Sequence, residues 1–233
     1  MLCAASLIVF LAIVLPGVFD LKHARRSYEI ESPVKRLLID SKGSVHLDIS
    51  PSRDGRVHVL RSSAISQDSR LIERHRLSGT TLTLRSSCTG SRFGVLRRCD
   101  LHYHLLVPKE VALSIRVHFG RTTVNGIRGR LDYRSDAGEF VGSGCSKLAY
   151  LSLDFGHVEF RDTCVPAVIR AHMKAGDIEL TVPAGRYAIR AESQRGGEIK
   201  RPFKNIIEDA SAPGRLDAEL AWAGAIKITG KSR

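Results

Sequence analysis

The second half of the chain contains a glycine that recurs at short intervals, and this feature most constrains the fold. Successive copies are separated by 18, 18, 20, 21 and 27 residues, and the second residue after the glycine is apolar in five of the six copies. A repeat of about 20 residues made of strands and turns suits one coil of a stack, or a pair of short strands. The glycines are Gly120, Gly138, Gly156, Gly176, Gly197 and Gly224, followed two positions later by Thr122, Phe140, Val158, Ile178, Ile199 and Ile226.

Most other segments alternate between apolar and polar residues, which indicates β-strands. The clearest are residues 36–40, 45–49, 56–60, 81–84 and 101–105, whereas helix-like spacing occurs only at 69–76 and in the N-terminal segment. We therefore predict an all-β protein. Its expected form is a single-sheet-stack β-solenoid, similar to a right-handed β-helix, whose coils of about 20 residues lie about 4.8 Å apart. One N-terminal transmembrane helix is expected to precede it.

Each repeat glycine is expected to lie where the chain turns between strands, because glycine adopts positive φ without steric cost. The same registry places Ile127, Cys145 and Cys164 at one inward position, seven or eight residues after their glycines. Cys145 and Cys164 would then touch on adjacent coils. They could be packed as free thiols or joined as a disulfide.

The N-terminal segment, residues 2–19, contains no charged side chain. Eighteen apolar-biased residues are near the minimum needed to cross a hydrocarbon core of about 30 Å. The segment is predicted to be an uncleaved anchor, because a cleaved signal peptide would have a basic start and a small-residue cleavage site. The predicted organisation is a membrane anchor at 1–20, a juxtamembrane linker at 21–33, a strand-rich lead-in at 34–108 and the repeat region at 109–230.

Two features of the sequence disagree about the side of the membrane on which the chain lies. Lys22, Arg25 and Arg26 follow the apolar run, and by the positive-inside rule they would keep the bulk of the chain in the cytoplasm. Cys88 and Cys99 flank a short loop between two strand-like runs, and a disulfide there requires an oxidising compartment. We predict that the bulk of the chain is extracytoplasmic.

The formal net charge is +12, with a sequence pI near 9.9. A basic field attracts nucleic acid, anionic lipid and acidic cell-wall polymers alike. No run of Lys and Arg is longer than two, and the charges alternate with apolar residues as on the outer face of a strand. An anionic cell-wall polymer or an envelope protein is therefore the expected partner, and nucleic acid is not.

Two junctions and one repeat copy carry a resemblance to a known family. The junctions are Val107-Pro-Lys-Glu-Val111 and Val182-Pro-Ala-Gly-Arg-Tyr187, and the repeat copy is Lys174-Ala-Gly-Asp-Ile-Glu-Leu180. Over most of its length the chain resembles the bacterial putative-adhesin family of β-strand repeat proteins, a domain of unknown function, in the membrane-anchored form of high-GC Gram-positive bacteria. The resemblance implies an anchor, a lead-in with a cysteine pair like Cys88 and Cys99, and stacked repeats.

The chain departs from the family pattern at four positions. The first junction has Glu110 where glycine is usual, and the acidic residue after the repeat glycine is replaced by Arg121, His157 and Ala225 in three copies. These changes weaken the expectation that the residues after the repeat glycines bind a shared ligand. They leave the fold expectation in place, because the glycine and the apolar position persist.

Catalytic motifs are not found in the sequence. His102 and His104 share one face of a strand, with His118 a conceivable third metal ligand, but no cysteine or carboxylate cluster accompanies them. Residues 142–146, Gly-Ser-Gly-Cys-Ser, lack the second glycine of a nucleophile turn. The carboxylates near neighbouring turns are each flanked by ordinary strand residues: Asp136, Glu139, Asp154, Asp177 and Glu179. No catalytic, cofactor-binding or metal-binding residue is therefore predicted.

The predicted function is that of a non-catalytic, membrane-anchored envelope protein whose repeat surface serves binding or adhesion. One alternative is a membrane-tethered sensor or assembly module of an envelope-stress or signalling system. Another is a carbohydrate-active enzyme, since stacked-coil proteins include polysaccharide lyases and hydrolases. An enzyme would need two carboxylates grouped in a groove of the stack.

Overall fold

The computed structural model describes residues 21–66, 69–90, 99–146, 148–165 and 167–231. Within these residues the protein contains fifteen strands in one sheet and no helix, so the all-β prediction is confirmed. The strands are β1 (Leu21–Ile30), β2 (Arg36–Pro51), β3 (Val57–Ser66), β4 (Ser69–Ser78), β5 (Thr81–Gly90), β6 (Cys99–Val107), β7 (Ala112–Ile127), β8 (Leu131–Gly144), β9 (Ala149–Asp162), β10 (Val168–Pro183), β11 (Gly185–Ser193), β12 (Glu198–Lys204), β13 (Ile206–Glu208), β14 (Arg215–Leu220) and β15 (Gly224–Lys231).

The predicted membrane anchor lies outside the described residues. Among the residues that are described, no helix is long and apolar enough to cross a membrane.

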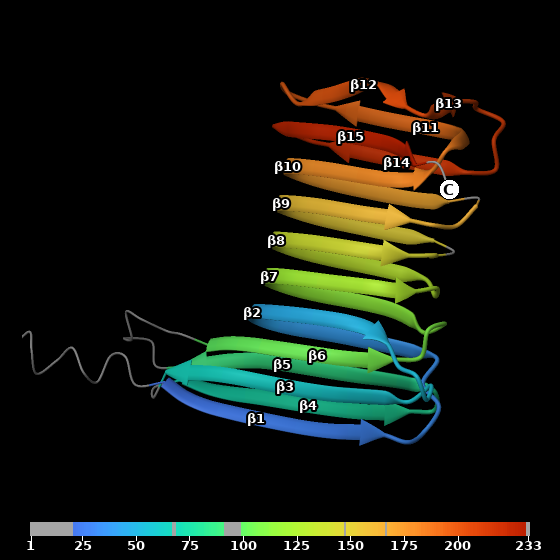
Figure 1. Ribbon diagram of the computed structural model, residues 1–233. Helices are drawn as coiled ribbons and strands as arrows, with labels where there is room; N and C mark the ends of the chain where they lie inside the picture. Colours follow the sequence, from blue (N-terminus) through green and yellow to red (C-terminus); the bar gives the residue numbers. More distant parts are fainter. Residues whose placement is uncertain (1–20, 67–68, 91–98, 147, 166, 232–233) are drawn as a thin grey trace, which may run out of the picture.

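The four long strands β7 to β10 each bend at a glycine into two arms. We call the part before the glycine the first arm and the part after it the second arm. Neighbouring strands pair in parallel along both arms, from Leu113–Leu131 in the first arm to Val124–Gly142 in the second. The arms form two layers, visible in Figure 1 as front and back ribbons at each level of the stack.

The core lies between the two layers. Alternate side chains of both arms are buried, so the apolar set of each strand points inward on either side of the bend. On β8 the rings of Tyr133 in the first arm and Phe140 in the second have centroids 4.5 Å apart. The predicted inward ladder is present: Thr122, Phe140, Val158, Ile178 and Ile226 are 0% exposed, and Ile199 is partly buried.

The repeat glycines form one row across the sheet. Gly120, Gly138, Gly156 and Gly176 pair with one another in turn, Gly176 also pairs with Gly224, and all five have φ between 120 and 140°. A Cβ built on any of these five would overlap the carbonyl oxygen of the preceding residue in the row. Glycine is therefore needed for conformation and for close approach. Gly197 differs from these five. It precedes Glu198, which pairs with Ala225, and the φ of Gly197 is not positive.

The lead-in, residues 34–108, belongs to the same sheet as the repeat region. The first arm of β2 pairs with β5 and the first arm of β7, and its second arm pairs with β6 and the second arm of β7. In the first-arm layer, β5 pairs antiparallel with β4. In the second-arm layer, β6 pairs antiparallel with β3, and β3 pairs antiparallel with β1. The lead-in thus extends both layers of the stack.

Two local expectations, one for the linker and one for the lead-in, differ from the structure. The expected linker at 21–33 is mostly strand β1, which pairs antiparallel with β3 over ten residues. The helix-like segment at 69–76 is strand β4, joined to β5 by a turn at Gly79. Both strands lie at an edge of the lead-in and are largely exposed, so neither carries the buried alternation by which a strand is recognised.

The coils at the C-terminal end are not stacked in the order of the sequence. β14 lies between β10 and β11, and β15 lies between β10 and β12. The last coil of the chain is therefore inserted between the two coils that precede it, and Figure 1 shows β14 and β15 below β11 and β12. Equal repeats can pair in either order, so periodicity does not determine which neighbour is chosen.

Replacing Gly156 by alanine is expected to lower the free energy of unfolding by about 3 kcal/mol or more, from backbone strain together with the overlap on Gly138. Gly43→Ala is a matched control, because Gly43 has φ 125° but nothing within 4 Å of an added Cβ. It should cost only the strain, about 1–2 kcal/mol. Urea unfolding of the two variants measures the difference. Equal losses would show that close approach does not constrain this row.

Candidate functional site

The outer face of the first-arm layer carries two rows of polar side chains across β8, β9, β10, β14 and β11. Pairing in the sheet puts residues of one row side by side, about 4.8 Å apart. The first row is Asp132, Tyr150, Arg170, Asp217 and Arg190, and the second is Arg134, Ser152, His172, Glu219 and Glu192.

The inserted coil determines the order of charges in these rows. Arg170 and Arg190 would be neighbours if the coils followed sequence order, but β14 places Asp217 between them. Arg170 Nε lies 3.3 Å from Asp217 Oδ2, and His172 Nδ1 lies 3.4 Å from Glu219 Oε2. In the first row, charges of opposite sign thus alternate across β10, β14 and β11, which avoids a repulsive pair of guanidinium groups. In the second row, Glu219 lies beside Glu192.

Tyr150 organises one end of the first row. The guanidinium carbon of Arg130 lies 5.2 Å from the centre of its ring and that of Arg170 lies 5.4 Å away, both within cation–π range. Arg170 also donates a hydrogen bond to the Tyr150 hydroxyl at 3.2 Å. Among the described residues Arg130 has no ion pair, so its donors are available to a ligand.

The two rows form the floor of a groove of about 1050 Å³. The segment Glu208-Asp209-Ala210, which begins at the last residue of β13, contributes to one side. Six carboxylates and four guanidinium groups line the groove, so its charge is mixed although the whole chain is strongly basic. This composition gives many hydrogen-bond donors and acceptors in one place and no excess of positive charge.

Two carboxyl groups of the groove have lowered pKa values. The hydrogen bonds from Arg190, at 2.8 and 3.1 Å, hold the pKa of Glu192 below its usual range. Hydrogen bonds from the Ser211 hydroxyl and backbone lower the pKa of Asp209. Both groups are therefore ionised at neutral pH.

The residues considered as metal ligands are dispersed. His102 lies against Asp48 at 2.7 Å, whereas His118, on a different strand, lies 2.8 Å from Asp136. A separate group, Glu29, Asp54 and His58, has ligand atoms within 4.8 Å of one another. Arg56 already lies 2.7 Å from a carboxylate oxygen of Glu29, so this group is arranged as an ion-pair cluster.

The carboxylates near the turns each contact a donor group. Asp136 pairs with His118, Glu139 with Arg121, Asp154 with Lys174 and Glu179 with Lys227, while Asp177 accepts a hydrogen bond from the Ala225 backbone. Of residues 142–146, Ser143 donates to Asn125 at 3.0 Å. These residues form surface ion pairs and strand contacts.

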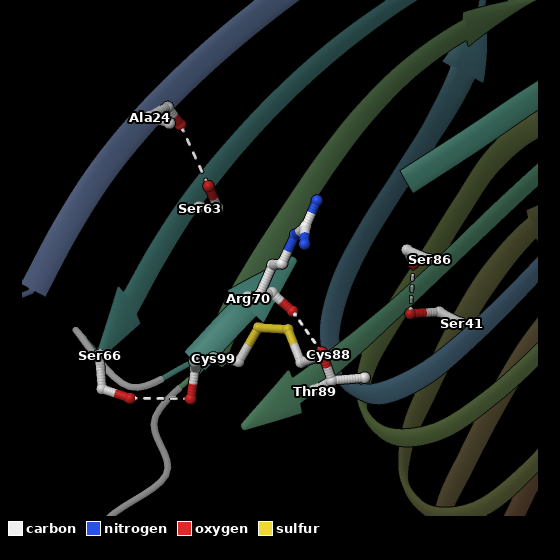
Figure 2. Close-up of a disulfide and its surroundings, with 10 residues drawn as sticks. Ala24, Ser41, Ser63, Ser66, Arg70, Ser86, Cys88, Thr89 and Cys99 are labelled. Atoms are coloured by element: carbon white, nitrogen blue, oxygen red, sulfur yellow. Dashed lines mark hydrogen bonds between the residues drawn. A yellow bond between two sulfur atoms is a disulfide. The ribbon is translucent and has the colours of Figure 1, made fainter. Parts of the chain in front are cut away.

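Both cysteine pairs are bonded in the structure. Cys88 on β5 and Cys99 on β6 connect the two layers of the lead-in, beside the hydrogen bond from the Thr89 hydroxyl to the Arg70 carbonyl (Figure 2). Cys145 and Cys164 follow the second arms of β8 and β9, with Cα atoms 4.7 Å apart. The register between β7 and β8 differs here from the expected one, because an irregularity at Gly126 aligns Ile127 with Gly144 and not with Cys145.

Asp162 is buried next to the second disulfide and is only 2% exposed. One carboxylate oxygen accepts a hydrogen bond from the Cys164 backbone at 2.8 Å, and the other has no partner among the described residues. Burial raises the pKa of Asp162 to about 6, although the backbone hydrogen bonds act in the opposite direction. Asp162 was not singled out in the sequence analysis, because a single aspartate at the end of a strand does not differ in pattern from an exposed one.

No known protein-family profile and no curated protein matches the chain. Among solved structures, a putative cell adhesion protein from Clostridium sporogenes is 14% identical with a TM-score of 0.47, over 91% of this chain and 100% of that one. A putative adhesin from Bacteroides fragilis is 14% identical with a TM-score of 0.39, over 89% and 97%. A putative lipid binding protein from Parabacteroides distasonis is 11% identical with a TM-score of 0.26, over 91% and 96%. All three scores are below 0.5, so the matches carry no argument about function.

The stability of the protein should depend on pH through Asp162. Its folded-state pKa of about 6 is above the ordinary value of 3.8, so the folded protein holds this proton more tightly than the unfolded chain. The free energy of unfolding should therefore fall by up to about 3 kcal/mol as the pH rises from about 4 to about 6. Asp162→Asn should lack this component. Parallel pH profiles of the native protein and the variant in urea unfolding would contradict the assignment.

Proposed function

We propose that the chain is a non-catalytic binding protein of the bacterial cell envelope, and that its groove binds a hydroxyl-rich glycan. In this proposal residues 2–19 anchor it in the membrane, and the stack is a β-solenoid on the extracytoplasmic side. The observation that carries the proposal is the row Arg170, Asp217 and Arg190, in which guanidinium and carboxylate groups alternate in register across three strands of the groove floor.

The chemistry of the groove favours hydroxyl groups over a single charged group. An arginine offers five N–H donors and a carboxylate about four acceptor positions, so Arg170 and Asp217 each keep unused capacity after pairing. A hydroxyl group both donates and accepts, and a glycan presents many hydroxyls along an extended chain. Parallel pairing repeats the donor and acceptor groups from strand to strand, which suits a polymer.

The mixed charge of the groove refines the expected ligand. Six carboxylates in the lining oppose a strongly anionic polymer, even though the chain has a net charge of +12. A neutral or zwitterionic cell-wall glycan fits better. The two disulfides support an oxidising location outside the cytoplasm.

A binding role fits the groove carboxylates better than catalysis does. Glycoside hydrolysis needs one carboxylic acid with a raised pKa to protonate the leaving group. The pKa values of Glu192 and Asp209 are lowered, and Asp217 and Glu219 are paired with Arg170 and His172. We expect a bound glycan to keep its chain length on incubation with the protein, which chromatography of the glycan would measure.

Arg170→Ala should weaken binding to purified cell-wall glycan about tenfold, because it removes hydrogen-bond donors for the glycan. It also removes the contacts by which Arg170 holds Tyr150 and Asp217 in place. Arg161→Ala is the matched control, since Arg161 is an exposed arginine on the second-arm layer. Isothermal titration calorimetry with the purified chain measures both. Unchanged affinity in Arg170→Ala, or an equal loss in Arg161→Ala, would refute the groove as the binding site.

A further inference from the structure

The edge at which the strands bend carries three exposed aromatic side chains. Phe119 is 53% exposed, Phe155 is 46% exposed and Trp222 is 47% exposed. The residues just before the glycines pair in the order Phe119, Ala137, Phe155 and Ala175, so large rings alternate with small side chains. The Trp222 ring lies over this row, with its centroid 6.0 Å from that of Phe155.

The charged groups beside these rings are paired with one another. His118 lies 2.8 Å from Asp136, Lys174 lies 2.6 Å from Asp154, and Arg121 lies 3.5 Å from Glu139. Paired charges are less costly to move out of bulk water than isolated ones. The bend edge therefore combines exposed aromatic surface with a nearly neutral polar surround.

The N-terminal end of the described chain lies at this same edge. Pairing across the sheet aligns Ala24 with Ser63, Ser63 with Leu101, Leu101 with Val45, and Val45 with Gly120. Ala24 thus lies in the glycine row. Leu21, three residues earlier, is at the bend side, where Figure 1 shows β1 beginning.

We propose that the bend edge rests on the lipid headgroup region of the membrane. The proposal uses the anchor of the proposed function: residues 2–19 carry no charge and join the stack at Leu21, so a membrane-spanning segment would hold this edge against the bilayer. Aromatic side chains are favoured at the interface between hydrocarbon and water. Lys22 and Arg25, both exposed on β1, add attraction to anionic lipid beside the anchor.

This contact defines how the protein is oriented. With its bend edge on the membrane, the stack lies along the bilayer, and the opposite edge, which carries Val165 and Ile207, points away from it. The groove on the first-arm layer then opens sideways, parallel to the membrane. A glycan lying close above the membrane could reach it without passing under the protein.

Trp222 is the single tryptophan of the chain, so its fluorescence reports on this edge alone. The full chain is reconstituted in vesicles of phosphatidylcholine with phosphatidylglycerol, prepared with and without bromine on the lipid acyl chains near the headgroup. We expect a loss of Trp222 fluorescence in the brominated vesicles and a shift of the emission to shorter wavelength. Unquenched fluorescence would overturn the proposal. The emission then distinguishes an edge exposed to water from an edge covered by a second copy of the chain, which would shift it to shorter wavelength.

Two double variants test whether the aromatic row causes the contact. Phe119→Ser with Phe155→Ser keeps the anchor and should relieve the quenching of Trp222. Val165→Ser with Ile207→Ser removes similarly exposed apolar side chains from the opposite edge, and it should leave the quenching unchanged. Quenching that persists in the Phe variant, or that disappears equally in both variants, would refute the role of the row.

Glycan binding distinguishes this proposal from the one for the groove. Arg170→Ala should lose glycan affinity while Trp222 remains quenched, and the Phe119→Ser, Phe155→Ser variant should do the reverse. Quenching without glycan binding in the native protein would remove the proposed function and keep the membrane contact. Glycan binding without quenching would remove the membrane contact alone.

Discussion

The structure depends on a close approach between backbones at the bend of each long strand. At Gly138 and Gly156 a side chain would occupy the space of the neighbouring carbonyl oxygen, and the positive φ of both residues turns the strand back over itself. Because β7 to β10 bend at the same point, the pairing between them continues along both arms without a change of register at the glycine. The two layers, the apolar ladder between them and the polar rows outside all follow from this common bend.

The ends of such a stack leave strands without a partner, and the lead-in shows how one end is closed. Its interior changes from apolar to polar: Tyr103 donates a hydrogen bond to Glu73 at 2.7 Å, and Arg61, 4% exposed, lies 3.7 Å from the same carboxylate. Burial and this hydrogen bond raise the pKa of Tyr103. The outermost strands β1 and β4 carry many charged residues and little buried surface, which discourages pairing with another chain.

The sequence was sufficient to predict the strands, the repeat and its inward ladder, because each leaves a local pattern. Val158 and Ile178 lie between polar neighbours and follow a glycine at a fixed distance, so burial can be inferred from a single coil. Strand β1 left no pattern, since its side chains are exposed and only its backbone pairs. The order of the last coils also leaves no pattern in the sequence, because β14 and β11 have the same alternation of apolar and polar residues and either could pair with β10. The groove was missed for that reason: Asp217 reaches Arg170 only through the insertion.

The insertion of the last coil has a consequence for how the protein is made. The chain is synthesised from its N-terminus, so β11 and β12 emerge before β14 and β15, yet the later pair must occupy the position next to β10. Until β14 and β15 are available, the edge of β10 that faces away from β9 lacks its native partners, and the groove floor lacks Asp217 and Glu219. A chain that lacks β14 and β15 would therefore have most of its core and an incomplete groove floor. The groove floor is therefore completed by the addition of β14, and not by the stacking of each successive coil.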